Sequence, residues 1–338
     1  LWAMIAIVSV CAGLWALEIS LIGIGLWLPV GLGVISAVAS AIIAYIIRFL
    51  LEERKRKRIE KAFGYYLAPS IVNQLAETSE ELKLGGEKRE ITVMFADLSG
   101  FTALSSKLKP EDLVSLTNKY LTLITHEVEA DGGYVDKFIG DAVMAVWGAP
   151  VLTESHCEQA VSAAVRISEK IDEENSIAKE KGEIGFAVKI GVSTGEAIVG
   201  NVGSKTRFNY TAIGEAVNIA ARLESLPGVY DCNVVISGAT ATKLSDQFIL
   251  RELDRVTVKG IEAALPIFEP LNGASSEIAD TYALALSKYR NRNFREAIAM
   301  WESLEDKPSK VMAARSRKFL TNPPPDDWAG EWPTPGVA

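Results

Sequence analysis

The amino-acid sequence predicts an α+β domain with strands and helices in the order β-α-β-β-α-β, preceded by two transmembrane helices and a helical linker. Three observations support this prediction. The first 50 residues are almost free of charge, the residues from Arg89 onward alternate between strand-like and helix-like apolar patterns, and Gly85-Gly86 with charged neighbours separates the two regions. The two patterns differ in period, about 2 against about 3.6 residues, so they can be told apart.

Residues 1–50 are predicted to form a transmembrane region. Apart from Glu18, no charged residue occurs before Arg48, which leaves more apolar chain than the roughly 20 residues that one span needs. Pro29 divides this stretch, so we expect two spans, at about 1–19 and 27–50, in contact with membrane lipid. A signal peptide followed by one span is the alternative, but no basic region or small-residue cleavage site precedes the apolar run.

Residues 51–86 are predicted to form a helical linker. Glu52–Arg58 reads EERKRKR, and five basic residues directly after a span indicate the cytoplasmic side of the membrane. The expected location is therefore the cell (inner) membrane, multi-pass, with the following domain in the cytoplasm. Ile59–Glu77 continues as an amphipathic helix, and Pro69 opens a second short one. The linker either passes on a signal or acts as a spacer, and the pattern does not distinguish these two roles.

Residues 87–271 carry the β-α-β-β-α-β pattern, which is that of the ferredoxin-like split βαβ arrangement. The expected elements are a buried strand at 91–98, a helix at Glu111–Asp131, a hairpin at 134–148 with Gly140-Asp141 at its tip, a helix at Glu158–Glu174, a pair of strands at 186–203, a helix at Glu215–Leu226, and short strands at 234–238 and 255–260. Residues 272–338 are expected to form a helical pair, at 278–290 and 294–304, and an irregular tail rich in Pro and Trp from Asn322.

Composition excludes several classes of function. The net charge is −8 and the pI is about 5.1, which does not fit a nucleic-acid-binding protein. The three cysteines, Cys11, Cys157 and Cys232, have neither metal-ligand spacing nor a disulfide pattern, which indicates a reducing compartment. No HExxH, GxSxG or CxxC motif is present, so metalloprotease, serine hydrolase and thioredoxin chemistry lack support.

Two aspartates lie at positions where burial of an unpaired carboxylate for a purely structural role would cost free energy. Asp97 ends a buried strand in FADLSGFT, and Asp141 occupies the predicted hairpin tip in FIGDAVMA. An unpaired buried carboxylate is expensive, and two carboxylates brought together repel each other unless a divalent cation lies between them. Oxygen ligands suit Mg²⁺ or Mn²⁺. Each aspartate alone is more often an ordinary turn residue, so this pattern by itself leaves both interpretations open.

The residues after Asp97 indicate a tight turn that enters a helix. Ser99, Gly100, Phe101 and Thr102 form this turn, and backbone N–H groups at a helix start can bind a phosphate. The alternative is an ordinary helix cap by the hydroxyl of Ser99 or Thr102.

Four long motifs in order carry a family resemblance. They are FADLSGFT, GGYVDKFIGDAVMAVWG, IGVSTGEAIVGNVGS and YTAIGEAVNIAARLE. From Arg89 to Pro270 the chain resembles the catalytic domain of the class III nucleotidyl cyclases, which covers a little over half of its length. The resemblance implies an enzyme of signal transduction that forms a cyclic nucleotide and pyrophosphate from a nucleoside triphosphate.

The resemblance also implies roles for individual residues. Asp97 and Asp141, with the backbone carbonyl of Leu98, would bind two Mg²⁺ or Mn²⁺ ions. One ion would activate the ribose 3′-hydroxyl for attack on the α-phosphate, and the other would neutralise the triphosphate. Asn218 would orient the ribose. Arg222, one helical turn further on, would stabilise charge on the transferring phosphorus.

Two positions bear on the choice of base. Lys137 occupies the adenine-reading position of the family, and Thr211 occupies its partner position, where many members have Asp. A lysine can donate to adenine N1 and a hydroxyl can accept from the adenine amino group, so the resemblance implies an adenylate cyclase acting on ATP. Guanylate cyclases of the family usually have Glu and Cys there. Lys259 matches a phosphate-contacting lysine, although Ile261 stands where a second lysine often follows. A guanylate cyclase, or a catalytically inactive cyclase-like regulatory module, remains the alternative.

The resemblance further implies a homodimer with shared active sites. In this family the aspartates of a site come from one chain and the base-reading, ribose-reading and arginine residues from the other. One chain here has a full set, so two equivalent sites related by twofold symmetry are expected. The chain begins at Leu1 and not at a methionine, and by analogy with bacterial cyclases we expect an upstream sensor domain outside this sequence.

Overall fold

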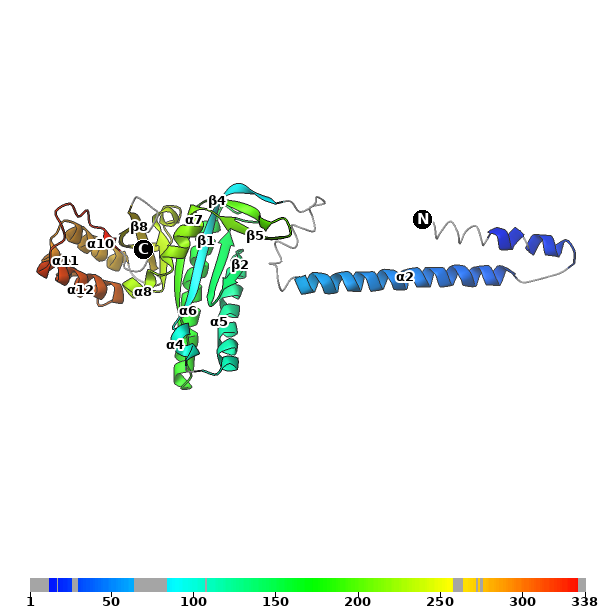
Figure 1. Ribbon diagram of the computed structural model, residues 1–338, viewed down its shortest axis with the longest axis horizontal. Helices are drawn as coiled ribbons and strands as arrows, with labels where there is room; N and C mark the ends of the chain where they lie inside the picture. The colour runs from blue at the N-terminus through cyan, green and yellow to red at the C-terminus, as the bar shows by residue number, and fades with distance from the viewer. Residues whose placement is uncertain are drawn as a thin grey trace. The chain divides into compact units, whose positions relative to one another are not determined.

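The computed structural model describes residues 12–16, 18–25, 30–63, 84–106, 108–257, 264–271, 273 and 276–333. The chain divides into two compact units, residues 1–72 and residues 73–338. Figure 1 labels α2 of the first unit and most of the helices and several strands of the second. The parts of the predicted linker that follow residue 63, including Pro69, lie outside the described residues until Leu84.

The first unit contains one long apolar helix, α2 (Val30–Phe63). Within the described residues it carries the single stretch that is long and apolar enough to cross a membrane, Ile35–Lys55. Its apolar side chains are exposed; Tyr45, for example, is 72% exposed. The second predicted span thus falls within α2. The first predicted span, 1–19, lies largely outside the described residues, and the described helix Ala12–Ile22 is shorter than a span requires. Two spans are therefore not seen.

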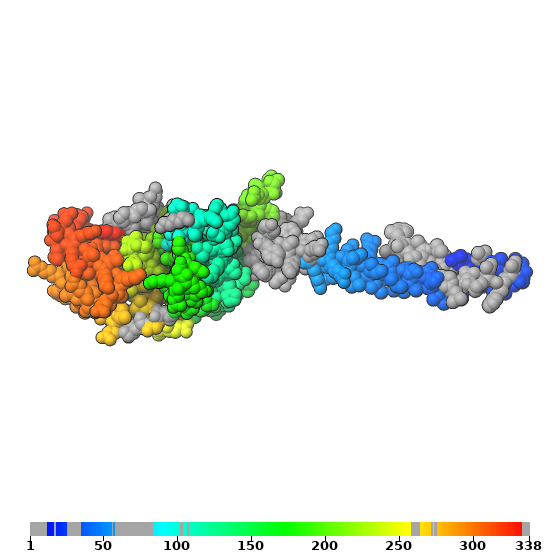
Figure 2. Space-filling model, turned by 90° about the horizontal axis from the view of Figure 1, so that it is seen from below, coloured from blue at the N-terminus to red at the C-terminus, as the bar shows by residue number. Residues whose placement is uncertain are grey.

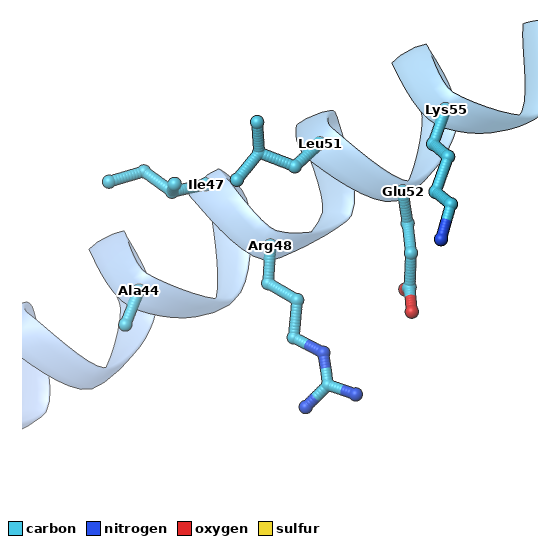
Figure 3. Close-up of a pocket in the computed structure, with 6 residues that line it drawn as sticks. All are labelled: Ala44, Ile47, Arg48, Leu51, Glu52 and Lys55. Carbon is cyan, nitrogen blue, oxygen red and sulfur yellow. The ribbon is translucent and has the colours of Figure 1, made fainter. Parts of the chain in front are cut away.

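The helix α2 does not end where its apolar stretch ends. It continues through the charged run to Phe63, because Glu, Lys and Arg are good helix formers and no glycine or proline interrupts them. Figure 3 shows this transition, with Ile47 and Leu51 on one side of the helix and Arg48, Glu52 and Lys55 projecting on the other. These side chains outline only a shallow groove along a single helix.

The second unit is built on four antiparallel strands. They are β1 (Gly85–Ser99), β2 (Tyr134–Ile139), β3 (Ala142–Trp147) and β4 (Ala187–Ser204), and they lie side by side in the order β2-β3-β1-β4. The predicted hairpin is confirmed, since β2 and β3 are joined at Gly140-Asp141. This order, with the first and third strands in the middle, is the split βαβ arrangement that the sequence predicts.

The prediction of two strands within residues 186–203 is wrong. This segment forms one long strand, β4, whose antiparallel partner on one side is β1, from Gly85 opposite Asn201 to Ser99 opposite Ala187. The hairpin partner of β4 is β5 (Arg207–Ile213), which follows the turn at Lys205-Thr206. Three glycines of the segment permit close backbone approaches rather than marking a strand end: Gly191 faces α7 (Glu215–Leu223), Gly200 faces β1 and Gly203 faces β5.

Helices cover both faces of this sheet. On one face, α4 (Phe101–Ser105), α5 (Pro110–Ala130) and α6 (His156–Glu180) pack against even-numbered β1 residues such as Met94 and Ala96. The helix α7 (Glu215–Leu223) packs on the other face, over Gly191 of β4. The predicted helices at 111–131 and 215–226 are confirmed within a few residues, and α6 is longer than predicted.

One buried carboxylate joins α5 to α6. Glu127 is 4% exposed and accepts hydrogen bonds from Lys170 Nζ at 2.5 Å and from Arg166 Nε at 3.1 Å, with His126 Nδ1 at 2.9 Å. Burial alone would raise the pKa of Glu127, but these hydrogen bonds outweigh it and lower the pKa to about 2.

The sheet continues beyond β4 into the C-terminal part of the chain. The added strands are β6 (Val234–Ser237), β8 (Leu265–Leu271), β7 (Ile249–Thr257) and β9 (Trp332–Pro333), in that order. The short helices α8 (Pro227–Tyr230) and α9 (Gly238–Ala241) connect them. The tail from Asn322 is therefore not wholly irregular, because β9 pairs with β7.

Three helices complete the C-terminal part: α10 (Ser276–Arg290), α11 (Phe294–Glu302) and α12 (Lys307–Thr321). The first two match the predicted pair. Their aromatic side chains, including Tyr289 and Trp301, form a second buried cluster together with residues of β7. Figure 2 shows these residues, in orange and red, packed against the yellow and green residues that precede them.

Candidate active site

The sheet register brings the two predicted aspartates together. Asp97 near the end of β1 is the cross-strand partner of Ala142, the first residue of β3. Asp141 directly precedes Ala142, in a turn where Gly140 has a φ of +66°, a conformation that glycine adopts without strain. Burial raises the pKa of Asp97 above its usual value, and the negative charge of Asp141 raises it further. The two carboxylates therefore repel each other across a short gap.

Two charged residues beside this pair were missed by the sequence analysis. Lys189 on β4 is the cross-strand partner of Asp97 on its other side, and its positive charge partly offsets the rise in the pKa of Asp97. Glu224 follows α7, and burial together with the charges of Asp97 and Asp141 raises its pKa to about 7. For Glu224, the only signal in the sequence was its place in the AARLE motif. For Lys189 there was none, because the sequence does not reveal the register that places it opposite Asp97.

The helix α7 lies very close to the sheet because β4 has a glycine beneath it. A Cβ atom at Gly191 would lie 2.3 Å from the backbone nitrogen of Glu224 and 2.5 Å from the carbonyl oxygen of Ala220. This contact fixes the distance between α7 and the sheet. The helix carries Asn218 and Arg222, four residues apart on one side. Asn218 is exposed and Arg222 is half-buried.

The two predicted base-reading residues meet side chain to side chain. Lys137 Nζ on β2 donates a hydrogen bond to Thr211 Oγ1 on β5 at 3.1 Å. The Thr211 hydroxyl in turn donates to Oδ2 of Asp136, a residue to which the sequence analysis gave no role. Strand β5 pairs with β4, yet it also reaches β2, as the rings of Tyr134 and Tyr210 show with centroids 6.3 Å apart.

The predicted phosphate turn has mixed features. Gly100 has a φ of +93° and precedes α4, whose first two residues are Phe101 and Thr102. The ring of Phe101 stacks on Phe186, so this side chain belongs to the core. Ser99 Oγ is buried with no hydrogen-bond partner among the described residues, so Ser99 does not cap the helix. Lys259 lies outside the described residues.

Within one chain, no hydrogen bond or ion pair of the described residues joins the predicted metal-binding residues to the predicted base-reading residues. Asp97 and Asp141 make up the first set, and Lys137 and Thr211 make up the second. The charged groups that shift the pKa of Asp97 are Asp141 and Lys189, and Arg222 is not among them.

Comparison with known proteins decides the family. Residues 86–270 match the family described as the adenylate and guanylate cyclase catalytic domain. The chain belongs to the class III nucleotidyl cyclases. The matched range includes the two aspartates, Lys137 and Thr211, and α7.

Curated relatives of this cyclase include proteins named adenylate cyclases. Adenylate cyclase 1 of Rhizobium meliloti is 35% identical over 207 residues, which covers 61% of this chain and 31% of that protein. The adenylate cyclase of Anabaena cylindrica is 30% identical over 244 residues, which covers 70% of this chain and 48% of that protein. The chain thus spans between about a third and a half of the length of these relatives.

Solved structures of both nucleotide classes resemble this cyclase. The adenylyl cyclase CyaB from P. aeruginosa is 31% identical, with a TM-score of 0.52, over 57% of this chain and 99% of that chain. The guanylyl cyclase Cya2 is also 31% identical, with a TM-score of 0.50, over 55% of this chain and 94% of that chain. Overall similarity therefore does not distinguish ATP from GTP as the substrate.

The donor set of this cyclase fits a metal-dependent site. Asp97 and Asp141 offer hard carboxylate oxygens whose mutual repulsion a divalent cation would relieve. The hydroxyl of Ser99, two residues after Asp97, is buried without a hydrogen-bond partner in the part of the chain that the structure describes. Among the described residues no group of three or more His, Cys, Asp or Glu side chains gathers as a ready metal cage. A pair of carboxylates is nevertheless a usual ligand set for Mg²⁺, which is held by one or two carboxylates together with substrate phosphates and water.

Proposed function

We propose that this cyclase is an adenylate cyclase, which converts ATP to 3′,5′-cyclic AMP and pyrophosphate. The observation that carries the proposal is the contact between Lys137 Nζ and Thr211 Oγ1. A lysine ammonium can donate to the unprotonated N1 of adenine but opposes the N1–H of guanine. The hydroxyl of Thr211 can accept from the adenine amino group. The names of the two curated relatives described above support the same substrate.

Each remaining residue has a role in the proposed reaction. Asp97 and Asp141, with the carbonyl of Leu98, would hold two Mg²⁺ or Mn²⁺ ions, which supply charge neutralisation and lower the pKa of the ribose 3′-hydroxyl. Asn218 orients the ribose by hydrogen bonding. Arg222 places a guanidinium beside the α-phosphate as negative charge develops there. Backbone groups of the turn at Ser99, Gly100, Phe101 and Thr102, together with Lys259, bind phosphate oxygens.

A homodimer with two shared sites is part of the proposal. Within the described part of one chain, no hydrogen bond or ion pair joins the metal-binding pair to the base-reading pair, which supports a site completed by a second copy. A twofold axis would create two identical sites, each with the aspartates of one chain and the Lys137–Thr211 pair of the other.

We further propose that α2 anchors the cyclase to a membrane with the catalytic domain in the cytoplasm. The exposed apolar side chains of the stretch Ile35–Lys55 support insertion into lipid. The basic residues after Leu51 support a cytoplasmic exit. The segment between α2 and β1 would then connect the anchor, and any sensor upstream of it, to the dimer.

The test is turnover of the purified chain with Mg²⁺ or Mn²⁺ and either ATP or GTP, with both cyclic products measured. We expect cyclic AMP to be the main product. The double variant Lys137→Glu/Thr211→Cys should lose activity with ATP, because it removes the donor for adenine N1. Equal turnover of GTP and ATP by the unaltered protein would contradict the substrate assignment and favour a guanylate cyclase, which the similarity to Cya2 keeps as the second candidate. Absence of both products would indicate an inactive regulatory module.

A further inference from the structure

A third side chain contacts the predicted base-reading pair, Lys137 and Thr211. Asp136 precedes Lys137 on β2, and its Oδ2 accepts the hydrogen of the Thr211 hydroxyl. The same Oδ2 lies 3.7 Å from Lys137 Nζ. Three side chains from two strands that do not pair with each other are thus joined through one hydroxyl oxygen, since Thr211 Oγ1 also accepts from Lys137.

Asp136 is buried behind the pair and does not line the surface. Its side chain is 1% exposed, whereas that of Lys137 is 38% exposed. Its other oxygen, Oδ1, is buried without a hydrogen-bond partner among the described residues. Burial is the main cause that raises the pKa of Asp136, and the contacts with Thr211 and Lys137 oppose that rise. Burying a carboxylate in this way costs free energy, so the contacts that Asp136 does make must offset that cost.

The hydroxyl of a threonine is by itself indifferent to the choice of base. It can accept a hydrogen bond from the amino group of adenine, or it can donate one to the carbonyl oxygen at the same position of guanine. A carboxylate accepts and cannot donate while ionised. With its hydrogen held by Asp136 and one lone pair accepting from Lys137, Thr211 has a single oxygen lone pair left for the base.

We propose that Asp136 is a positioning residue for base selection, which holds the Thr211 hydroxyl as an acceptor and so restricts the pocket to bases that present an amino group at this position. This inference rests on the proposed function, because it assumes that Lys137 and Thr211 face the base. It assigns to two residues in series, Thr211 and Asp136, the acceptor role that an Asp at position 211 would fill directly. Asp136 acts through Thr211 and does not itself touch the nucleotide.

The test uses two variants of similar side-chain size: Asp136→Asn, which can present an N–H to Thr211 Oγ1, and Asp136→Leu, which removes both acceptor oxygens. The hydroxyl hydrogen is then released and can point at guanine. We expect kcat/KM for ATP divided by that for GTP to fall about tenfold or more, since a buried acceptor site rejects the wrong partner strongly. Thr211→Ser should keep the ratio and Thr211→Val should lower it. Asp131→Asn, which removes a carboxylate paired with Arg166 outside this group, is the matched control and should leave the ratio unchanged.

A double-variant cycle separates this role from a general loss of structure. If Asp136 acts through the hydroxyl, Asp136→Asn should change the ratio in the natural background and leave it unchanged in a Thr211→Val background. Equal effects in both backgrounds, or an unchanged ratio in folded Asp136→Leu, which has no acceptor oxygen, would overturn the inference. If neither Asp136 variant folds, an unchanged ratio of kcat/KM for ATP to that for GTP in Thr211→Val would also overturn the inference.

A binding measurement distinguishes failure of this inference from failure of the proposed function. The probes are 3′-deoxy-ATP and 3′-deoxy-GTP, which lack the attacking hydroxyl and so report affinity without turnover. If the unaltered protein forms no cyclic product but prefers 3′-deoxy-ATP, and Asp136→Asn removes that preference, the inference stands and the proposed activity fails. If the unaltered protein makes cyclic AMP but Asp136→Leu keeps the preference for ATP in turnover and for 3′-deoxy-ATP in binding, the activity stands and the inference fails. If the unaltered protein binds neither probe, both the inference and the proposed activity fail.

Discussion

Replacing Gly191 by alanine tests how closely α7 must approach the sheet. The new Cβ would lie 2.3 Å from the nitrogen of Glu224, 2.5 Å from the oxygen of Ala220 and 2.7 Å from the carbonyl carbon of Leu223. All three are backbone atoms, so no side chain can rotate away, and ordinary van der Waals contact begins only at 3.4 Å. The helix must therefore move outward by about 1 Å.

The displacement has two expected consequences. Overpacking of this kind costs about 1–3 kcal/mol of unfolding free energy, so the melting temperature should fall by several degrees. Because α7 carries Asn218 and Arg222, a shift of about 1 Å should also reduce cyclase turnover by about 100-fold. Differential scanning fluorimetry and a cyclic-nucleotide assay on the same preparation measure the two effects.

The matched control is Gly195→Ala, four residues further along β4. There the Cβ would meet only the Cβ of Ala216 on the same helix, at 3.4 Å. We expect this variant to melt within a few degrees of the unaltered protein and to keep most of its activity. If Gly191→Ala behaved like Gly195→Ala in both assays, the close contact between α7 and β4 would not be what positions the helix, and the reasoning would be refuted.

Three further predictions concern the carboxylates. Asp97→Ala and Asp141→Ala should each lower cyclase turnover at least about a hundredfold with an unchanged circular-dichroism spectrum; near-normal turnover would refute the metal assignment. Mixing inactive Asp97→Ala with inactive Arg222→Ala should restore about one quarter of the activity, because half of the dimers are then mixed and contain one intact site; no recovery in proven heterodimers would indicate sites within one chain. The depressed pKa of Glu127, about 2, contributes stability that is present above its unfolded value of about 4.5 and lost as pH falls toward 2. Urea unfolding of Glu127→Gln should therefore show lower stability at pH 7 and a weaker dependence on pH, whereas the exposed Glu129→Gln should show neither.

Local patterns were sufficient for most elements of the catalytic domain. The hairpin with Gly140-Asp141 at its tip and the helix beginning at Pro110 could be predicted, because turn and capping preferences act within a few residues. The strand β4 could not, because its glycines look like breaks until the backbones that approach them are known. The helical character of the first part of the linker, residues 51–63, could also be predicted, and α2 runs through these good helix-forming residues.

The sequence by itself determined the family and most of the order of the elements, and it predicted residues for metal, ribose and base, because each of these depends on residue type and spacing along the chain. Only the tertiary structure decided which of these residues meet. Sheet register places Lys189 beside Asp97, and the path of β5 brings Thr211 to Asp136 and Lys137. Those neighbours are far apart in sequence, and a shift of register by one residue would turn every side chain of a strand to the opposite face. Their pKa values and hydrogen bonds therefore follow from pairing between distant segments, which no local pattern encodes.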